Sequence, residues 1–277
     1  AADKASLYLT VTEFRNNFIG LYVAPHKQGN NLNLYKFEDN SFLGGRLLPS
    51  FMGLQATPTL TQSQTTGTVR PMGTYSPNGQ FISSGLAGIY VWDVVALNLH
   101  TAKPSMRNQF GRLVTGITAF RTNLRVNSCS FRNIKKLSLY AANLGYQGCA
   151  IHAQGERNGS LVVQGMITNT SSTPFVGTTT FEHCDIGISA QSIEGLDVDH
   201  CGMSQINQLG VRALSCVGSN LSVKGCRMEG LRGIGIGFYY NHMDTESILA
   251  TNELEMQNNN PQQTSNMTAG ILVVDYL

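Results

Sequence analysis

Charged residues are scarce in this chain of 277 residues. Asp, Glu, Lys and Arg make up 13% of it, about half of the usual share. The net charge is only +2 and the basic residues are scattered along the sequence, so we expect no nucleic-acid partner. The 29 glycines, together with many Asn, Ser and Thr residues, predict a polar, turn-rich surface of the kind common in extracellular β proteins.

Long apolar runs are also missing. No run reaches the roughly 18 residues that a membrane-spanning helix needs, so no membrane span is expected. No charged and then apolar leader opens the chain, and we expect that any signal peptide has been removed.

Cysteine motifs for metals or disulfides are absent as well. The six cysteines include no C-x-x-C pair, the six histidines no H-x-x-x-H pair, and the chain is longer than typical disulfide scaffolds. We interpret the cysteines as small buried residues with free thiols. Neither zinc nor any other resident metal is expected.

A repeat takes the place of these motifs. The segments "EGLDVDHCGM" (194–203) and "SNLSVKGCRM" (219–228) share Leu-x-Val-x-x-Cys-x-Met at an offset of 25 residues, while their polar residues differ. The segment "LRVNSCSF" (124–131) repeats the pattern with phenylalanine. Units of this length indicate a repeat architecture.

The last residue of the motif serves as a register mark along the chain. Successive marks fall at Phe181, Met203, Met228 and Leu254, and the pair Phe14 and Phe37 is spaced by 23 residues. The segments that follow the marks align without gaps at 14–23, 131–140 and 181–190, and related alternating stretches occur at 87–91, 210–214, 233–237 and 269–274.

This unit of 22–26 residues predicts a right-handed parallel β-helix. Alternation of period two gives each short strand an inner and an outer face, and stacked copies bury an apolar face that one copy cannot bury alone. Inward residues therefore recur and outward residues drift. We expect Cys129, Cys201, Cys226 and Asn252 to form one internal column, in which the amide of Asn252 passes hydrogen bonds along the stack.

The whole chain, residues 1–277, is expected to be a single domain interrupted by four insertions. The stretches 43–86, 100–112, 168–179 and 256–268 break the period, and insertions in repeat proteins often gather on one face, which is commonly the binding face. Neither end shows a capping helix, so we expect a segment of a longer chain, or other domains or chains that cover the ends.

The register "F-x-x-C-x-x-G-I-x-A … L-x-V-x-x-C-x-M" of residues 181–203 resembles right-handed parallel β-helix proteins of the pectate-lyase-like superfamily. It looks most like the degenerate coils of large secreted bacterial surface proteins, and it covers roughly residues 1–42 and 87–277. The superfamily includes pectate lyases, polygalacturonases, phage tailspikes and adhesin passengers. A shared fold does not carry an activity across.

Four outward residues form a candidate catalytic cluster: Asp197, Asp199, His200 and Lys224. Carboxylates beside a base would suit a lyase that uses Ca²⁺ to neutralise a uronate, or a glycoside hydrolase with an acid and a base. The alternative is an ordinary surface ion pair between Asp199 and Lys224 on adjacent coils. The paired Asp, Gly-His-Gly and Arg-x-Lys motifs of polygalacturonases and the Arg-x-Pro-x-x-Arg of pectate lyases are absent, which favours this second interpretation.

Four aromatic residues form a candidate binding group: Tyr90, Trp92, Tyr239 and Tyr240. If they point outward they would make a platform for stacking sugars, and if they point inward they belong to the core.

The sequence thus favours a secreted or cell-surface structural and recognition module, adhesin-like, with a polysaccharide or cell-surface glycan as partner. An enzyme that cleaves acidic polysaccharide, with Ca²⁺ if it is a lyase, is the first alternative. A passive spacer or secretion cargo segment is the second.

Overall fold

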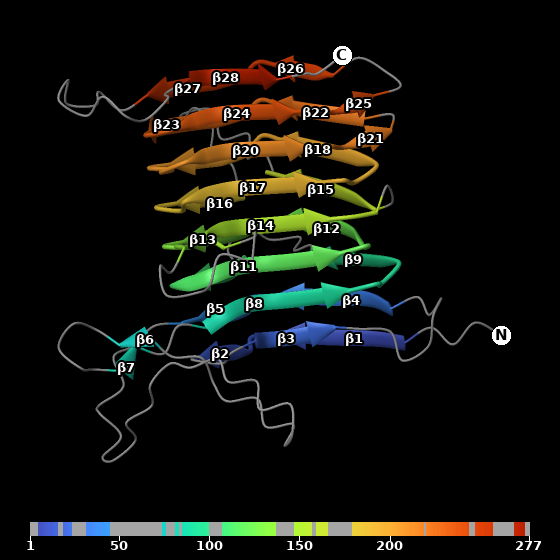
Figure 1. Cartoon of the computed structure of the whole chain (residues 1–277). Helices are drawn as coiled ribbons and strands as arrows, with labels where there is room; N and C mark the ends of the chain where they lie inside the picture. Colours follow the sequence, from blue (N-terminus) through green and yellow to red (C-terminus); the bar gives the residue numbers. More distant parts are fainter. Residues whose placement is uncertain are drawn as a thin grey trace, which may run out of the picture.

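The computed structural model describes residues 5–15, 19–23, 32–44, 74–75, 81–82, 85–99, 107–136, 147–156, 159–165, 179–218, 220–243, 247–256 and 269–274. These residues form strands and turns without an α-helix, and most of the strands belong to three long parallel sheets. The strands lie in successive layers from the N-terminal to the C-terminal part of the chain (Figure 1).

Sheet I has six strands, all paired in parallel. It contains β9 (Ala96–Leu99), β12 (Asn123–Asn127), β15 (Ser160–Gln164), β18 (Gly195–Asp199), β22 (Asn220–Lys224) and β26 (Ile248–Ala250). A parallel pair of β1 (Ala5–Thr10) and β4 (Leu32–Glu38) lies next to it, with β4 in contact with β9.

Sheet II has eight parallel strands. They are β2 (Glu13–Arg15), β5 (Ser41–Leu43), β10 (Asn108–Gly111), β13 (Cys129–Arg132), β16 (Thr180–Glu182), β19 (Gly202–Ser204), β23 (Arg227–Leu231) and β27 (Glu253–Met256).

Sheet III also has eight parallel strands. They are β3 (Ile19–Val23), β8 (Gly85–Trp92), β11 (Leu113–Phe120), β14 (Cys149–Gln154), β17 (Ile186–Gln191), β20 (Leu209–Leu214), β24 (Ile234–Tyr239) and β28 (Ala269–Val274).

Two short pairs accompany the three sheets. The strands β21 (Val217–Gly218) and β25 (His242–Met243) are parallel, and β6 (Thr74–Tyr75) and β7 (Phe81–Ile82) are antiparallel. Along the chain the long sheets are visited in the order I, II, III and then I again. This order is consistent with a parallel β-helix.

The register marks form a stack of side chains inside sheet II. The rings of Phe42, Phe110, Phe131 and Phe181 follow one another with centroids 4.7–5.1 Å apart and planes within 11° of parallel. Met203 and Met228 continue this column in register. Like residues stack on like because each strand pairs with the copy of itself in the next layer.

A column of glycines in sheet III faces this stack. Gly88, Gly116, Gly187 and Gly210 occupy equivalent positions, with Ala150 between Gly116 and Gly187. A Cβ atom on Gly116 would lie 2.7 Å from the ring of Phe131 and 2.4 Å from the carbonyl oxygen of Ala150. The glycines therefore make room both for the aromatic stack and for the backbone of the next layer.

The chain turns between sheets through single residues in the left-handed conformation. Fourteen described residues other than glycine have φ between 46° and 57°, among them Ser128 and His200 at turns from sheet I to sheet II and Asp39 at the turn from β4 to sheet II. Backbone hydrogen bonds continue through these turns, as from the His200 N–H to the Lys224 carbonyl at 2.9 Å. One such residue changes the direction of the chain without breaking the ladder.

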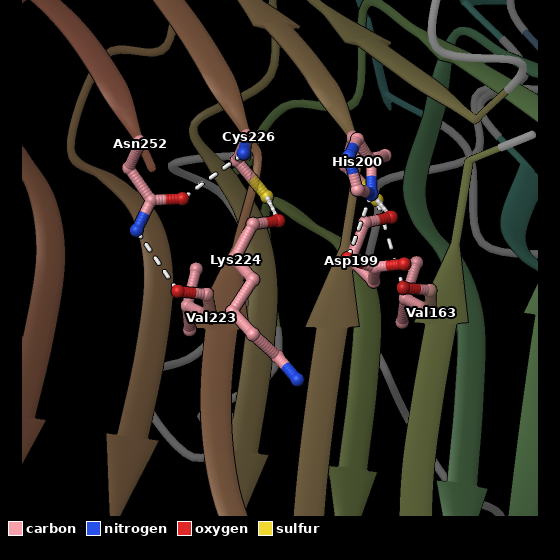
Figure 2. A network of polar contacts seen from close by, with 8 residues as sticks. Val163, Asp199, His200, Val223, Lys224, Cys226 and Asn252 are labelled. Atoms are coloured by element: carbon pink, nitrogen blue, oxygen red, sulfur yellow. Dashed lines mark hydrogen bonds and ion pairs between the residues drawn. The ribbon is translucent and has the colours of Figure 1, made fainter. Parts of the chain in front are cut away.

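The expected internal column after these turns is present. Cys129, Cys201 and Cys226 are buried with free thiols, and the pairing of Gly202 with Arg227 aligns Cys201 with Cys226. Asn252 Oδ1 accepts a hydrogen bond from the Cys226 N–H at 3.0 Å, and its Nδ2 donates to the Val223 carbonyl at 2.9 Å, as Figure 2 shows. Two further asparagines, Asn40 and Asn108, extend the column.

Two sequence alignments were wrong. The partner of Phe14 is Phe42 and not Phe37, which lies on β4 and pairs with Leu9. In the alignment of 131–140 with 14–23, residues 137–140 lie outside the described ones, and the strand of this layer that joins sheet III is β14, which begins only at Cys149.

The expected insertions fall where the chain enters or leaves sheet II, but they are shorter than predicted. Asn108–Gly111 of the stretch 100–112 forms β10. In the stretch 43–86, Leu43 is the last residue of β5 and β8 begins at Gly85. Thr179, at the end of the stretch 168–179, is buried, and Met256, at the start of the stretch 256–268, is the last residue of β27. Gly44, Arg107 and Arg112 are also described, and apart from β6 and β7 the remaining residues of these stretches lie outside the described ones.

Candidate functional site

The predicted acidic cluster lies at the end of sheet I. Asp197 and Asp199 belong to β18, Asp199 is paired in register with Lys224 of β22, and His200 follows at the turn. The structure therefore brings the four residues into one region. A pocket of about 540 Å³ on the outer face of sheet II is lined by none of them.

Within this cluster the strongest contact is the pair Asp199 and His200. The Nδ1 atom of His200 lies 2.7 Å from Asp199 Oδ1, and both side chains are about one third exposed. Gly225, in the left-handed conformation at φ 59°, passes beside the imidazole, where a Cβ would come within 2.7 Å of His200 Nε2. A carboxylate that holds an imidazole in this way fixes its orientation and tautomer.

The surface ion pair expected between Asp199 and Lys224 is not formed. Among the described residues no ion pair involves Lys224, and Figure 2 shows its amine pointing away from Asp199. Asp197 faces Ser222 in register, and Ser222 is only 1% exposed. Asp197 Oδ1 and Ser222 Oγ are buried without a hydrogen-bond partner.

No arrangement for a metal was found in the described part of the chain, where no group of three His, Cys, Asp or Glu side chains could hold an ion. Cys129, Cys149 and Cys184 are not candidates for nucleophiles, because burial raises the pKa of these three thiols to about 12. A thiol of such high pKa is protonated and inert at neutral pH.

The predicted aromatic group lies on the outer face of sheet III, where Tyr90 and Trp92 are neighbours on β8. The Tyr90 ring stacks on Tyr22 of β3 at 5.6 Å, and Phe120 of β11 contacts both Tyr90 and Trp92 at about 5.5 Å. The Arg121 guanidinium lies 5.3 Å from the centre of the Trp92 ring. Trp92 is 41% and Tyr22 59% exposed, so this cluster presents apolar rings to solvent.

Tyr239 and Tyr240 lie at the other end of the same sheet and do not join this cluster. Tyr239 occupies the same row as Trp92, five strands further along. At the usual spacing of strands this is about 24 Å. The Tyr239 ring covers Gly237, whose Cβ would lie 2.6 Å from it, and burial raises the pKa of the Tyr239 hydroxyl.

A polar chain connects the two aromatic ends. Arg212 of β20 donates from Nη2 to Ser189 Oγ at 2.7 Å, and Ser189 Oγ lies 3.3 Å from His152 Nδ1. His152 Nε2 lies 3.4 Å from Gln154 Oε1. We call these aromatic and polar residues, which occupy two neighbouring outward rows from Tyr22 to Tyr239, the sheet III strip. Its members are Tyr22, Tyr90, Trp92, Phe120, His152, Gln154, Ser189, Arg212 and Tyr239.

The charge of the strip should be constant over the physiological pH range. Burial lowers the pKa of His152 to about 4, with Arg212 adding to the effect, so the imidazole is neutral above pH 5. Arg212 then supplies the positive charge in the middle of the strip.

The buried neutral His152 predicts a pH-dependent stability. Its pKa is about 6.5 in the unfolded chain and about 4 in the folded one, so the unfolded state binds the proton more tightly. Stability contributed by this residue is complete above pH 6.5 and falls as the pH drops to 4, by at most about 3 kcal/mol. Urea denaturation of the wild type and of His152→Gln at pH 7.5, 5.5 and 4.5 checks this. Identical pH profiles for the two proteins would contradict the prediction.

Sequence reasoning missed Tyr22 and Phe120. The alignment of "GLYV" (20–23) with "GIYV" (88–91) carries the signal for Tyr22, because the two tyrosines occupy the same position of the repeat. Arg212 of the strip lies on β20 of sheet III and therefore on a different sheet from the acidic cluster.

The described part of the chain holds no helix with the length and hydropathy needed to cross a lipid bilayer. Comparisons of the sequence and structure with models of protein families, with curated proteins and with solved structures each found no match. No family match therefore supports the resemblance to the pectate-lyase-like superfamily.

Proposed function

We propose that this protein is a secreted or cell-surface recognition module, adhesin-like, that binds a polysaccharide along the sheet III strip. In this proposal the three sheets form a right-handed parallel β-helix of the pectate-lyase-like kind, and this solenoid acts as a stiff rod. Support comes from the parallel in-register layers and from the weakly charged surface rich in glycine and asparagine.

The observation that carries the proposal is the cluster of rings at one end of the strip, in which Tyr22 and Trp92 are exposed, and the partly exposed Gln154 and Arg212 further along. Aromatic rings pack against the apolar faces of sugars, and the partly exposed amide of Gln154 and guanidinium of Arg212 can bind the sugar hydroxyls, whereas Ser189 and His152 are buried beneath them. Layers about 4.8 Å apart have a repeat close to the length of one sugar unit in an extended chain. Successive units of a glycan can thus meet equivalent positions of successive layers.

Removing the ring of Trp92 tests this proposal. A glycan array with the wild type identifies the ligand, and calorimetry with that glycan should show an affinity at least about tenfold lower for Trp92→Ala. Trp92→Phe keeps a ring and should retain most of the affinity. Val95→Ala, which changes an exposed apolar residue without a ring, serves as the matched control.

Two results would refute binding at this strip. One is a wild-type protein that binds no glycan on the array. The other is an unchanged affinity of Trp92→Ala for the glycan that the wild type binds. The first result would favour the passive spacer or cargo segment, for which neither binding nor turnover is expected.

The enzyme remains the second candidate because Asp199 holds His200 at 2.7 Å and an unpartnered carboxylate oxygen of Asp197 lies on the same strand. In a lyase the imidazole would remove a proton from a uronate, with Ca²⁺ on the carboxylates. This candidate predicts that the wild type cleaves polygalacturonate or another acidic polysaccharide and that Asp199→Asn lowers the rate at least about a hundredfold. Wild-type protein that releases no unsaturated or reducing ends from such substrates would exclude it.

A further inference from the structure

A second surface of the molecule carries a different chemistry. On the outer face of sheet II a pocket of about 540 Å³ crosses the strands from β2 to β16, and seven polar side chains line it. These are Arg15, Gln109, Arg112, Ser130, Arg132, Asn133 and Glu182. The volume falls in the range of small-ligand sites. We call this feature the arginine pocket.

The pocket exists because Gly111 has no side chain. In the register of sheet II, Gly111 lies between Leu43 of β5 and Arg132 of β13. A Cβ at this position would lie 3.2 Å from Leu43 Cδ2 and 3.7 Å from the Arg132 carbonyl oxygen. The backbone of β10 therefore forms the floor, and the side chains of the neighbouring layers form the rim.

The rim is held in place by the strands and by ion pairs. Arg132 donates from Nη2 to Glu182 Oε1 at 2.8 Å in the adjacent layer. Arg112 occupies the turn after β10 in the left-handed conformation, and its N–H donates to the Arg132 carbonyl at 3.0 Å. Among the residues that the structure describes, Arg112 forms no ion pair, whereas Arg15 is paired with Glu13.

We infer that the arginine pocket binds one acidic unit of a polysaccharide, through the carboxylate or sulfate group of that unit. The planar guanidinium forks of Arg112 and Arg132 match the two oxygens of such a group, and charge-assisted hydrogen bonds of this kind are the strongest polar contacts available. Gln109 and Ser130 are paired with each other two residues before Gly111 and Arg132 on the same strands, and they supply neutral donors and acceptors for sugar hydroxyls.

This site is separate from the sheet III strip, so the two proposals can fail independently. The strip offers rings and one arginine to a sugar chain, while the arginine pocket selects for negative charge. A nucleic acid would also present negative charge, but the chain has a net charge of only +2 and the rim holds Glu182 beside Arg132. An acidic saccharide is therefore the ligand class that the pocket fits.

Calorimetric titration of the full chain with three oligosaccharides of equal length tests the inference. A galacturonic acid oligomer carries carboxylates, a chondroitin sulfate oligomer carries sulfates as well, and a cellulose oligomer is neutral. We expect the wild type to bind at least one acidic oligomer in a salt-dependent manner and to bind it at least about tenfold more tightly than the neutral one. The ratio of the two acidic affinities shows which anionic group the pocket prefers.

Four variants locate the binding. Arg112→Gln and Arg132→Gln each remove a guanidinium, and Gly111→Leu fills the floor without changing the charge. Each should weaken binding of the acidic oligomer by about tenfold or more. Arg227→Gln is the matched control, because Arg227 lies on the same face of sheet II, is paired with Glu229 and does not line the pocket.

Two results would overturn the inference. One is a wild type that binds neither acidic oligomer with a Kd below about 1 mM. The other is an affinity for the acidic oligomer that is unchanged in both Arg112→Gln and Arg132→Gln. These two variants change exposed side chains, so they decide the question even if Gly111→Leu destabilises the fold. Trp92→Ala should leave binding of the acidic oligomer at this pocket unchanged. Failure of the proposal for the sheet III strip can therefore be distinguished from failure of the proposal for the arginine pocket.

Discussion

Gly116→Ala should destabilise the protein by about 3 kcal/mol or more, because a single added methyl group has nowhere to go. Its Cβ would lie 2.4 Å from the Ala150 carbonyl oxygen and 2.7 Å from Phe131 Cδ1. Phe131 stands in the aromatic stack between Phe110 and Phe181, with ring centroids 4.7 and 5.1 Å away. Neither the ring nor the backbone of β14 can move without disturbing the next layer.

Gly202→Ala provides the control for this experiment. Gly202 also lies in a strand, but its added Cβ would meet nothing closer than Thr180 Cγ2 at 3.7 Å. Its free energy of unfolding should stay within about 1 kcal/mol of the wild type. Urea denaturation followed by circular dichroism measures both. Equal stabilities of the two variants would show that the glycine column does not face the aromatic stack.

Asn108→Ala should cost about 3–5 kcal/mol, since it leaves several buried polar groups without partners. Asn108 Nδ2 donates to the Phe37 carbonyl at 2.8 Å, and its Oδ1 accepts from the N–H and the Nδ2 of Asn40 at 3.1 and 3.0 Å. Both asparagines are fully buried. The cavity left by the amide adds to the loss.

Asn123→Ala separates this effect from the general loss of an asparagine. Asn123 makes comparable hydrogen bonds, to the Val95 carbonyl and to Ser160, but it is exposed and water can replace them. A change below about 1 kcal/mol is expected for it in the same denaturation experiment. A loss for Asn108→Ala as small as that for Asn123→Ala would mean that Asn108 is not part of an internal hydrogen-bonded column.

The internal columns were predictable from the sequence because the layers impose equal requirements on equal positions. Cys201, Cys226 and Asn252 recur at nearly constant intervals, and so do Met203 and Met228. The spacing fails as a guide at Phe37, because Phe37 and Phe42 are both buried and only polar residues lie directly between them. Either phenylalanine could therefore be the residue that joins the stack. The left-handed Asp39 between them decides the register, and a backbone angle cannot be read from residue spacing.

The same limit explains the error at residues 131–140. The segment "LSLY" (137–140) alternates as a strand would, yet the strand that pairs with β11 and β17 is β14. Its residue in the glycine column is Ala150, which departs from the pattern and hides the match. Insertions of unequal length between equivalent strands remove the spacing signal.

The candidate sites were predictable only in part. Residues of one strand, such as Tyr90 and Trp92 or Asp197 and Asp199, point to the same face by alternation alone. The arginine pocket joins Arg15, Gly111 and Arg132 from three strands of sheet II, and the stretch 43–86 separates Arg15 from the other two in the sequence. Their proximity follows from the register of sheet II, and no local pattern in the sequence contains it.

Locating the sulfur atoms by anomalous scattering from crystals of the wild-type protein tests the in-register stacking most directly. The structure predicts that the sulfurs of Cys201 and Cys226 lie side by side in one internal column, with their Cα atoms about one strand spacing, roughly 4.8 Å, apart. Met203 and Met228 should form a second, parallel pair in the adjacent column. Cys201 and Cys226 sulfurs on opposite sides of the molecule, or antiparallel pairing of residues 196–198 with 221–223, would contradict the account.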